Sequence, residues 1–167
     1  MTSSRVVVAG FGNVLRGDDG VGVAVSHRLL DGLIPEGVTV LDVGIGGIAL
    51  VQELLEPAAG LVVVDAVDLG RPPGTVLVIR PDVTDVTALP VSARRDALAD
   101  MHLANPDRAL SVAAGMGLLP AETWLVGCQP RDADGLAEAL SPPVAAAVGP
   151  AAAEVRRLVT GLGIFWP

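Results

Sequence analysis

Two adjacent carboxylates occupy a turn where a divalent cation could bind. Asp18 and Asp19 lie in a glycine-rich segment that follows an apolar run at residues 6–9 and leads into a helical pattern. Such strand-to-helix turns are where α/β proteins build their sites. A dinucleotide-binding turn would need a third glycine where this chain has Leu15, and it would not place acids where a pyrophosphate meets the helix N-terminus. The segment therefore suits a cation better than a nucleotide.

A plainer role for these two acids is helix capping. Asp is among the residues preferred at a helix N-cap, where its carboxylate accepts a backbone N–H bond. Asp18 and Asp19 are successive residues, so they cannot both cap the same helix. Capping leaves at least one of the pair available for chemistry.

Asp65 is a further candidate carboxylate. It ends the apolar run at residues 61–64, which is typical of a buried strand. The carboxyl ends of neighbouring parallel strands converge on one crevice, so we expect Asp65 to lie close to Asp18 or Asp19. The alternative is a solvated strand end whose carboxylate hydrogen bonds to a turn.

His102 is the better ligand candidate of the two histidines. It lies at the end of a long polar segment, just ahead of a helix that Pro106 is suited to open. His27 lies between Ser26 and Arg28 on a predicted helix, and we expect it to be a surface residue. Two carboxylates and one imidazole would suit a borderline divalent ion such as nickel or zinc.

Cys128 is the single cysteine, so the chain can form no internal disulfide, in keeping with a reducing cytoplasm. A catalytic thiol would need a basic partner and a lowered pKa, and the sequence indicates neither. We therefore expect Cys128 to be a small buried core residue. Motifs of the Gly-x-Ser-x-Gly, His-Glu-x-x-His and phosphate-loop types do not occur in the sequence.

Apolar runs rich in Val and Leu predict the strands that must position these groups. They lack the period-two alternation of half-exposed strands, which indicates burial on both faces. The expected strands are residues 5–9, 38–41, 61–65, 75–79 and 123–126. Helical patterns occupy residues 19–31, 48–55, 106–114 and 143–159, the first with Val21, Val25, Leu29 and Leu33 on one face.

This alternation predicts a single α/β domain over residues 1–167. We expect a three-layer α/β/α sandwich whose mostly parallel sheet has about five strands, with one antiparallel edge after the Pro-Pro-Gly turn. Residues 80–105 are polar and poor in large apolar side chains, so we expect a long surface excursion with a short helix near residues 96–98. Long loops in compact domains are often functional.

Composition narrows the classes of partner. The net charge of −8, with scattered arginines and no lysine, argues against nucleic acid and excludes a Schiff-base lysine. Apolar blocks fall short of the roughly 18 residues that a membrane span needs. Residues 1–10 lack the basic region and long apolar stretch of a signal peptide. We therefore expect a cytoplasmic protein without membrane, nucleic-acid or nucleotide partners.

Several segments, taken in order, carry a resemblance to a known family. They are Gly10-Phe11-Gly12-Asn13-Val14-Leu15 leading to Asp19-Gly20, Asp65-Ala66 followed by Pro73-Gly74-Thr75, His102 with Leu110, Val126-Gly127-Cys128-Gln129-Pro130, and Leu140-Ser141-Pro142. In this order the chain resembles, nearly end to end, the endopeptidases that mature nickel-iron hydrogenases by trimming a C-terminal peptide from the large subunit.

The resemblance implies both a site and a partner. The family's metal-binding set corresponds here to Asp19, Asp65 and His102. Its metal is nickel already loaded in the substrate, the precursor of the hydrogenase large subunit. Asp19 and Asp65 are also the implied catalytic residues, which would activate the water that cuts the peptide, either as an aspartic-type or as a metal-assisted peptidase.

One difference from the family's sequence pattern concerns which hydrogenase precursor is the substrate. Some family members carry Asp-Gly-Gly-Thr where this chain has Asp42-Val43-Gly44-Ile45, so a hydroxyl is lost. The segment at residues 44–47 serves a turn or shapes a peptide groove. Two rival functions stay open: a nickel-checking chaperone that holds the large subunit without cutting it, and a nucleotide-dependent oxidoreductase suggested by Gly10 and Gly12 after a strand.

Overall fold

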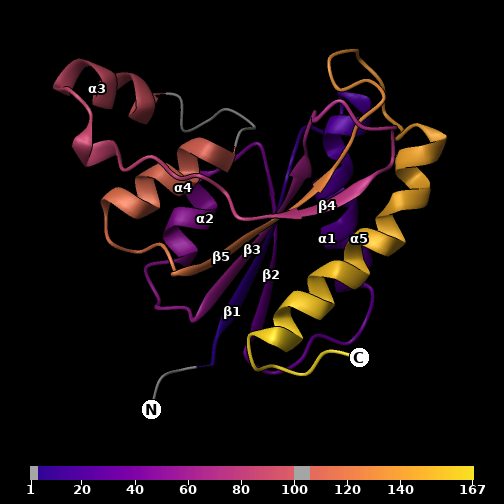
Figure 1. The fold of residues 1–167 in the computed structure, drawn as a ribbon, viewed down its shortest axis with the longest axis horizontal. Helices are drawn as coiled ribbons and strands as arrows, with labels where there is room; N and C mark the ends of the chain where they lie inside the picture. The colour runs from indigo at the N-terminus through magenta and orange to yellow at the C-terminus, as the bar shows by residue number, and fades with distance from the viewer. Residues whose placement is uncertain (1–3, 100–105) are drawn as a thin grey trace.

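The computed structural model describes residues 4–99 and 106–167, and its centre is an open five-stranded sheet in the order β2-β1-β3-β5-β4 (Figure 1). The strands are β1 (Val6–Phe11), β2 (Val38–Gly44), β3 (Gly60–Ala66), β4 (Val76–Ile79) and β5 (Glu122–Cys128). Neighbouring strands are parallel except β4, which runs antiparallel to β5. The predicted α/β sandwich with one antiparallel edge is confirmed.

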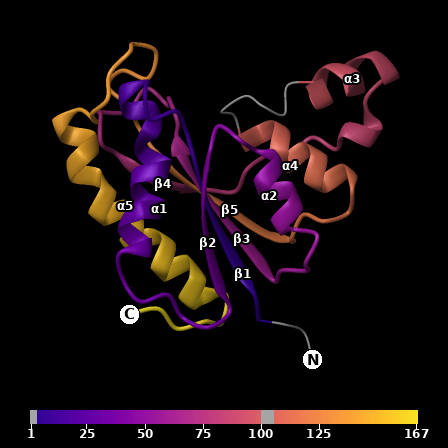
Figure 2. The same cartoon turned by 180° about the vertical axis from the view of Figure 1, so that it is seen from behind.

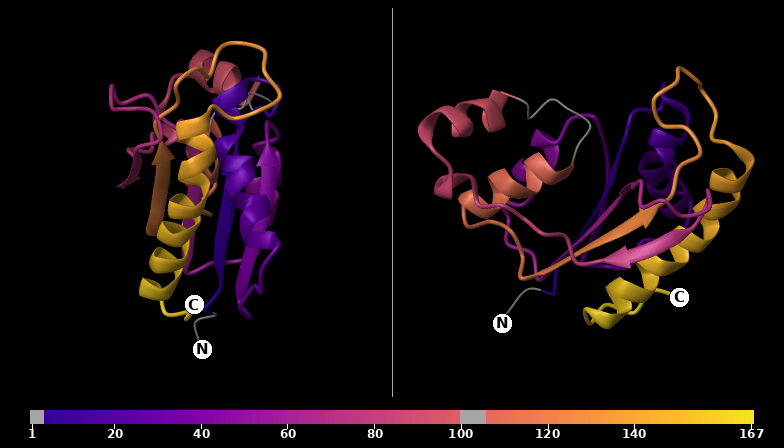
Figure 3. Two further views of the ribbon diagram at one scale, coloured as in Figure 1. Left: turned by 90° about the vertical axis from the view of Figure 1, so that its right-hand side faces the viewer. Right: turned by 45° about the horizontal axis from the view of Figure 1, so that its top comes forward.

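Helices cover both faces of the sheet. Figures 1 and 2 show α1 (Val21–Leu30) and α5 (Pro142–Gly161) on one side, and α2 (Ile48–Glu53) and α4 (Pro106–Gly115) on the other. The side view in Figure 3 shows how α5 runs along the length of the sheet. None of the helices in the described ranges is long and apolar enough to cross a membrane.

Burial on both faces explains the continuous apolar runs of the strands. In β1, Val6 and Val8 face the core under α1 and α5, while Val7 and Ala9 face the core under α2 and α4. Side chains of a strand alternate between faces, so a strand covered on both sides needs apolar residues at every position. The sequence signal for parallel buried strands is therefore confirmed.

Two helix predictions differ from the structure. The helix expected over residues 19–31 begins as a separate 3-10 turn, η1 (Gly17–Gly20), and ends at Leu30. Leu33 therefore lies beyond the helix and is 93% exposed, so its expected place on the apolar face is wrong. In the polar excursion, η2 (Val86–Ala88) precedes α3 (Val91–Ala99), which is longer than expected and projects away from the sheet (Figure 1).

The loop after β5 is held against the loop after β1 by the carboxylate of Asp18, in addition to backbone bonds such as that from Gly17 N to Ala137 O. Asp18 is 1% exposed and accepts four hydrogen bonds from the loop. Its Oδ2 accepts from the backbone N–H groups of Arg131 and Asp132 at 2.8 and 3.2 Å and from Ser141 Oγ at 2.8 Å, and its Oδ1 accepts from Ser141 N at 2.6 Å. We call this set of bonds the Asp18 clamp.

The Asp18 clamp also decides the ionisation of its carboxyl. Burial by itself raises the pKa of Asp18, but the bonds from Ser141, Arg131 and Asp132 together outweigh burial and leave that pKa below its ordinary value. The charged form is thus the one that the fold stabilises. The sequence suggested helix capping for this acid, yet neither η1 nor α1 has a side-chain cap bond, so that suggestion is wrong.

Replacing Asp18 with Asn should destabilise the fold at neutral pH. The Asn amide nitrogen cannot accept the bonds that the carboxylate accepts, and each buried donor left without a partner costs about 1–3 kcal/mol. Because the folded pKa is lowered, the wild-type advantage is full above the unfolded pKa of about 3.9 and disappears as pH falls through the lower folded value. Thermal unfolding at several pH values measures this.

Ser141→Ala is the matched control, since it removes one of the four donors and leaves the backbone donors in place. Its expected cost is about 1 kcal/mol, smaller than that of Asp18→Asn. Equal melting temperatures for Asp18→Asn and wild type at pH 7 would contradict a structural role for the clamp.

Candidate functional site

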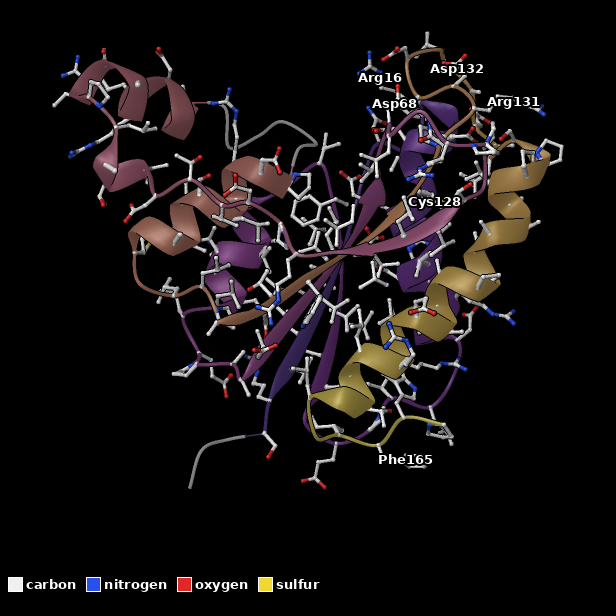
Figure 4. The ribbon with its side chains drawn as sticks, viewed as in Figure 1. Arg16, Asp68, Cys128, Arg131, Asp132 and Phe165 are labelled. Atoms are coloured by element: carbon white, nitrogen blue, oxygen red, sulfur yellow. The ribbon has the colours of Figure 1, made fainter. Side chains whose placement is uncertain are left out.

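The candidate residues gather where the parallel strands end. The loop after β1 carries Asp19, Asp65 is the penultimate residue of β3, and Cys128 ends β5. Figure 4 shows Arg16, Asp68, Arg131 and Asp132 on the loops at this end of the sheet, while Phe165 lies at the opposite end. We call this end the carboxyl edge. It is the edge at which open α/β sheets bind ligands.

Asp65 is a buried carboxylate with an unused oxygen. It is 8% exposed, and its Oδ1 has no hydrogen-bond partner among the described residues. Its pKa is raised well above the ordinary value, first by burial and then by the negative charge of Asp19, with a smaller contribution from Asp107. The backbone N–H of Ala66 opposes this rise without cancelling it. The alternative of a solvated strand end is wrong.

Asp19 lies near Asp65, as the sequence predicted, and it is held by its own loop. Its Oδ2 accepts a hydrogen bond from Asn13 N at 2.8 Å. Gly12 has a φ of +131°, and a Cβ at that position would lie 1.8 Å from the carbonyl oxygen of Asp19. Glycine is therefore required for the loop to bring Asp19 this close to β1. Asp19 serves the carboxyl edge rather than a helix cap.

Asp107 is a carboxylate of this site that the sequence analysis missed. It lies in the first turn of α4, and its negative charge contributes to the raised pKa of Asp65. Within β3, Leu61 and Val63 face the core under α2 and α4, so alternation turns Asp65 toward the same side. The sequence signal that could have identified Asp107 is an acid in the first turn of the helix after the polar excursion. At that position the helix dipole also stabilises a negative charge.

The expected metal set stays incomplete. His102 lies outside the described residues, so its distance to Asp19 and Asp65 is untested. Within residues 4–99 and 106–167, no three His, Cys, Asp or Glu side chains are grouped so that they could hold a metal ion. The unpartnered Oδ1 of Asp65 is nevertheless a hard oxygen donor of the kind that fits a divalent cation.

His27 is a surface residue, as predicted, but it is not isolated. Its side chain is 60% exposed, and its Nε2 lies 2.7 Å from Oδ2 of Asp42 at the end of β2. The pair joins α1 to the edge strand. Nothing in the spacing of the sequence indicated this contact, because it depends on the strand order.

Cys128 is inert, as expected for a core residue. It is fully buried, and burial together with the negative charge of Asp18 raises the pKa of its thiol to about 11. A thiol with that pKa is protonated at neutral pH, so it is not a nucleophile. The acids of the carboxyl edge remain the groups that could carry chemistry.

Asp65→Asn should raise the stability of the protein at neutral pH. An acid whose folded pKa is raised stabilises the fold only while it is protonated, and this contribution is lost as pH rises through the folded value. The uncharged Asn avoids that loss, and each kcal/mol gained corresponds to about 2–4 °C in melting temperature. The gain should vanish below about pH 3, beneath the unfolded pKa of about 3.9, where both states of the wild type bind the proton.

Asp31→Asn is the control, because Asp31 is an exposed acid just after α1. Its melting temperature should stay within about 1 °C of wild type across the pH range. A lower melting temperature for Asp65→Asn than for Asp31→Asn at pH 7 would show that the Asp65 charge is not a burden on the fold.

Comparison with known proteins identifies relatives of the same kind over nearly the whole chain. Residues 23–157 match the model of the hydrogenase maturation protease family. The chain is 37% identical over 161 residues to the hydrogenase expression/formation protein HupD of Rhodobacter capsulatus, covering 96% of this chain and 73% of HupD. It is 36% identical over 152 residues to HoxM of Azotobacter vinelandii, covering 90% of this chain and 70% of HoxM.

Solved structures agree with the sequence relatives. The hydrogenase maturating endopeptidase HybD from E. coli superposes with a TM-score of 0.76 at 25% identity, covering 96% of this chain and 95% of HybD. The hydrogenase 2 maturation peptidase from a Thaumarchaeota archaeon gives a TM-score of 0.67 at 33% identity, covering 95% of this chain and 99% of the peptidase. On this agreement of sequence and fold, the chain belongs to the hydrogenase maturation protease family.

Proposed function

We propose that this chain is the endopeptidase that removes a C-terminal peptide from the precursor of a nickel-iron hydrogenase large subunit. The observation that carries the proposal is the buried carboxylate of Asp65, with an unpartnered oxygen and the charge of Asp19 beside it. An uncompensated buried acid destabilises a fold. Its presence at the edge where α/β proteins bind ligands fits a group that acts on a substrate.

The raised pKa of Asp65 supports a role as general base. An Asp with an ordinary pKa near 4 is a weak base at neutral pH, whereas a raised pKa increases its affinity for the proton of water. In the proposed reaction, the Asp65 carboxylate takes a proton from water while the water oxygen bonds to the scissile carbonyl carbon. The C–N bond then breaks, and the proton passes to the leaving amine.

Asp19 has a different part in this scheme. The N–H of Asn13 donates to its Oδ2 and so fixes the carboxylate on the loop after β1. We assign Asp19 to positioning the water and keeping the pKa of Asp65 high. The two acids then take different roles, as paired carboxylates in different environments do.

Nickel belongs to the substrate in this proposal. Asp19, Asp65 and His102 supply carboxylate and imidazole donors, which suit nickel. Nickel already carried by the precursor would bind these groups and tether the scissile bond at the carboxyl edge. Only a loaded precursor would then be cut efficiently. We place the activity in the cytoplasm, in keeping with the single, unpaired Cys128.

The decisive measurement is the intact mass of the precursor. We expect the purified protein to shorten a nickel-loaded large-subunit precursor by a C-terminal peptide and to leave the nickel-free precursor unchanged. A stable complex in which the mass of the loaded precursor does not change would contradict the peptidase and support a chaperone. Equal cutting of both forms would contradict the role of nickel.

Asp65→Asn and Asp19→Asn should each lower the cleavage rate about 100-fold or more, since a positioned general base contributes about that much. Asp31→Asn is the matched control, and its rate should equal wild type. Because Asp65→Asn is expected to be the more stable protein, its loss of activity would not come from unfolding. Near-normal cleavage by Asp65→Asn would exclude the proposed base.

His102→Ala tests the nickel contact separately from the chemistry. We expect at least about tenfold weaker binding of the nickel-loaded precursor, and no change in the binding of the nickel-free precursor. Titration calorimetry with each form measures both affinities. Equal weakening for the two forms would mean that His102 contacts the polypeptide rather than the metal.

A further inference from the structure

Gln129 follows β5 directly, and its side chain is a buried amide whose bonding groups are all occupied. It is 6% exposed. Its Oε1 accepts hydrogen bonds from Leu69 N at 2.8 Å and from Arg71 N at 3.2 Å. Its Nε2 donates to Asp68 Oδ1 at 3.0 Å and to Pro130 O at 3.3 Å. An amide offers two acceptor positions and two donors, so these partners fix the side chain in one orientation.

The backbone of Gln129 binds the same connection between β3 and β4, which comprises residues 67–75. Its N–H donates to Thr75 O at 2.9 Å, and its carbonyl oxygen accepts from Gly74 N at 2.8 Å. The side chain thus holds the middle of the connection, and the backbone holds the end that leads into β4. We call residues 67–75 the β3–β4 connection.

Asp65 lies just before the β3–β4 connection, opposite the residues that lead to Gln129. In the parallel pair of β3 and β5, Asp65 is in register with Gly127 and Ala66 is in register with Cys128. Gln129 is the next residue after that register pair. The residue that binds the connection is therefore adjacent in the chain to the last register partner of β3.

The direction of the Asp65 carboxylate depends on the backbone of the next residue. Its Oδ1 has no partner among the described residues, and the backbone N–H of Ala66 is hydrogen bonded to the carboxylate. The following residue, Val67, begins the connection, and its N–H donates to Cys128 O at 2.9 Å. A shift of the connection would turn the Ala66 N–H and move the carboxylate with it.

The β3–β4 connection has few buried contacts of its own. Residues 68–73 are all exposed. Exposed segments with little buried surface open easily, unless hydrogen bonds to a more stable part of the fold hold them. Gln129 supplies such bonds from a buried position at the end of a central strand. Its amide therefore limits the motion of the segment that follows Asp65.

We propose that Gln129 is a positioning residue for Asp65. Its buried amide holds the β3–β4 connection, and the connection in turn holds the Asp65 carboxylate where it meets the scissile bond. This inference rests on the proposed peptidase function and adds to it a residue that acts on the reaction without touching the substrate. A displacement of about 1 Å in a reacting group lowers a rate about 100-fold, so this role affects kcat rather than substrate binding.

The first test separates kcat from KM. Gln129→Ala should lower kcat for the nickel-loaded precursor about tenfold or more and leave KM within about twofold of wild type. Thr123→Val is the matched control. Thr123 is also buried, and its Oγ1 donates to Pro120 O at 2.6 Å, but it lies at the opposite end of β5. Its kcat should stay within about twofold of wild type. Wild-type kcat in Gln129→Ala would overturn the proposal.

An exchange of the bonded groups tests the same role if Gln129→Ala does not fold. Gln129→Glu keeps an acceptor for Leu69 N and Arg71 N but places a carboxylate against Asp68. Adding Asp68→Asn supplies an amide that can donate to that carboxylate. We expect Gln129→Glu alone to lower kcat about tenfold, and the double variant to recover it to within about threefold of wild type, since bonded residues are non-additive. A folded double variant without recovery would overturn the proposal.

The amide resonance of Ala66 reports the position of Asp65 without any precursor. Its N–H is bonded to the Asp65 carboxylate, so its chemical shift depends on that bond. In nitrogen–hydrogen correlation spectra of the full chain, Gln129→Ala should move the Ala66 resonance and speed hydrogen exchange at the amides of Leu69 and Arg71. Thr123→Val should do neither. An unmoved Ala66 resonance in Gln129→Ala would overturn the proposal even if kcat falls.

The outcomes separate this inference from the proposed function. If wild type does not shorten the precursor, the peptidase function fails and this inference fails with it. If wild type cuts and Gln129→Ala cuts with the same kcat, only the positioning role is excluded. A raised KM with unchanged kcat would mean that Gln129 contributes to substrate binding, which also overturns the proposal. Melting temperatures well above the assay temperature confirm that each variant is folded.

Discussion

The loops of the carboxyl edge are joined by the hydrogen bonds that Asp18 accepts from the loop after β5, together with backbone bonds between the same two loops. These bonds join two loops whose bonded residues are 113 to 123 positions apart in the chain. They anchor η1, which carries the neighbouring Asp19, and the charge of Asp19 contributes to the raised pKa of Asp65. One buried, fully bonded carboxylate therefore helps to hold the loop that carries one member of the proposed reacting pair, Asp19.

Asp18 and Asp65 show how the environment separates structure from function. Both are buried acids at the carboxyl edge, at 1% and 8% exposed. The bonds to Asp18 lower its pKa, so its charge stabilises the fold, whereas Asp65 has an unpartnered oxygen and a raised pKa. An ionised anchor and an acid with a raised pKa thus occupy the same edge of the sheet. Activity at the cost of stability is common in enzyme sites.

Much of the fold could be predicted because the signals were local. The apolar run at residues 61–64 indicated a strand buried on both faces, and β3 confirms it. The Pro-Pro-Gly turn indicated the antiparallel edge strand that is observed as β4. Predictions were wrong where tertiary contacts override local pattern: Leu33 fits the apolar periodicity of α1 but lies beyond its end, and Asp18 reads as a cap but bonds to a distant loop.

The sequence by itself determined the fold class, the acids at the strand ends and the family resemblance, because these rest on residue type, period and order along the chain. Only the tertiary structure decided which of the adjacent acids is the anchor and which raises the pKa of Asp65, since the anchor is chosen by the donors of a loop far along the chain. It also brought Asp107 to the site and paired His27 with Asp42. Such contacts follow from strand order and helix placement, which no local spacing in the sequence expresses.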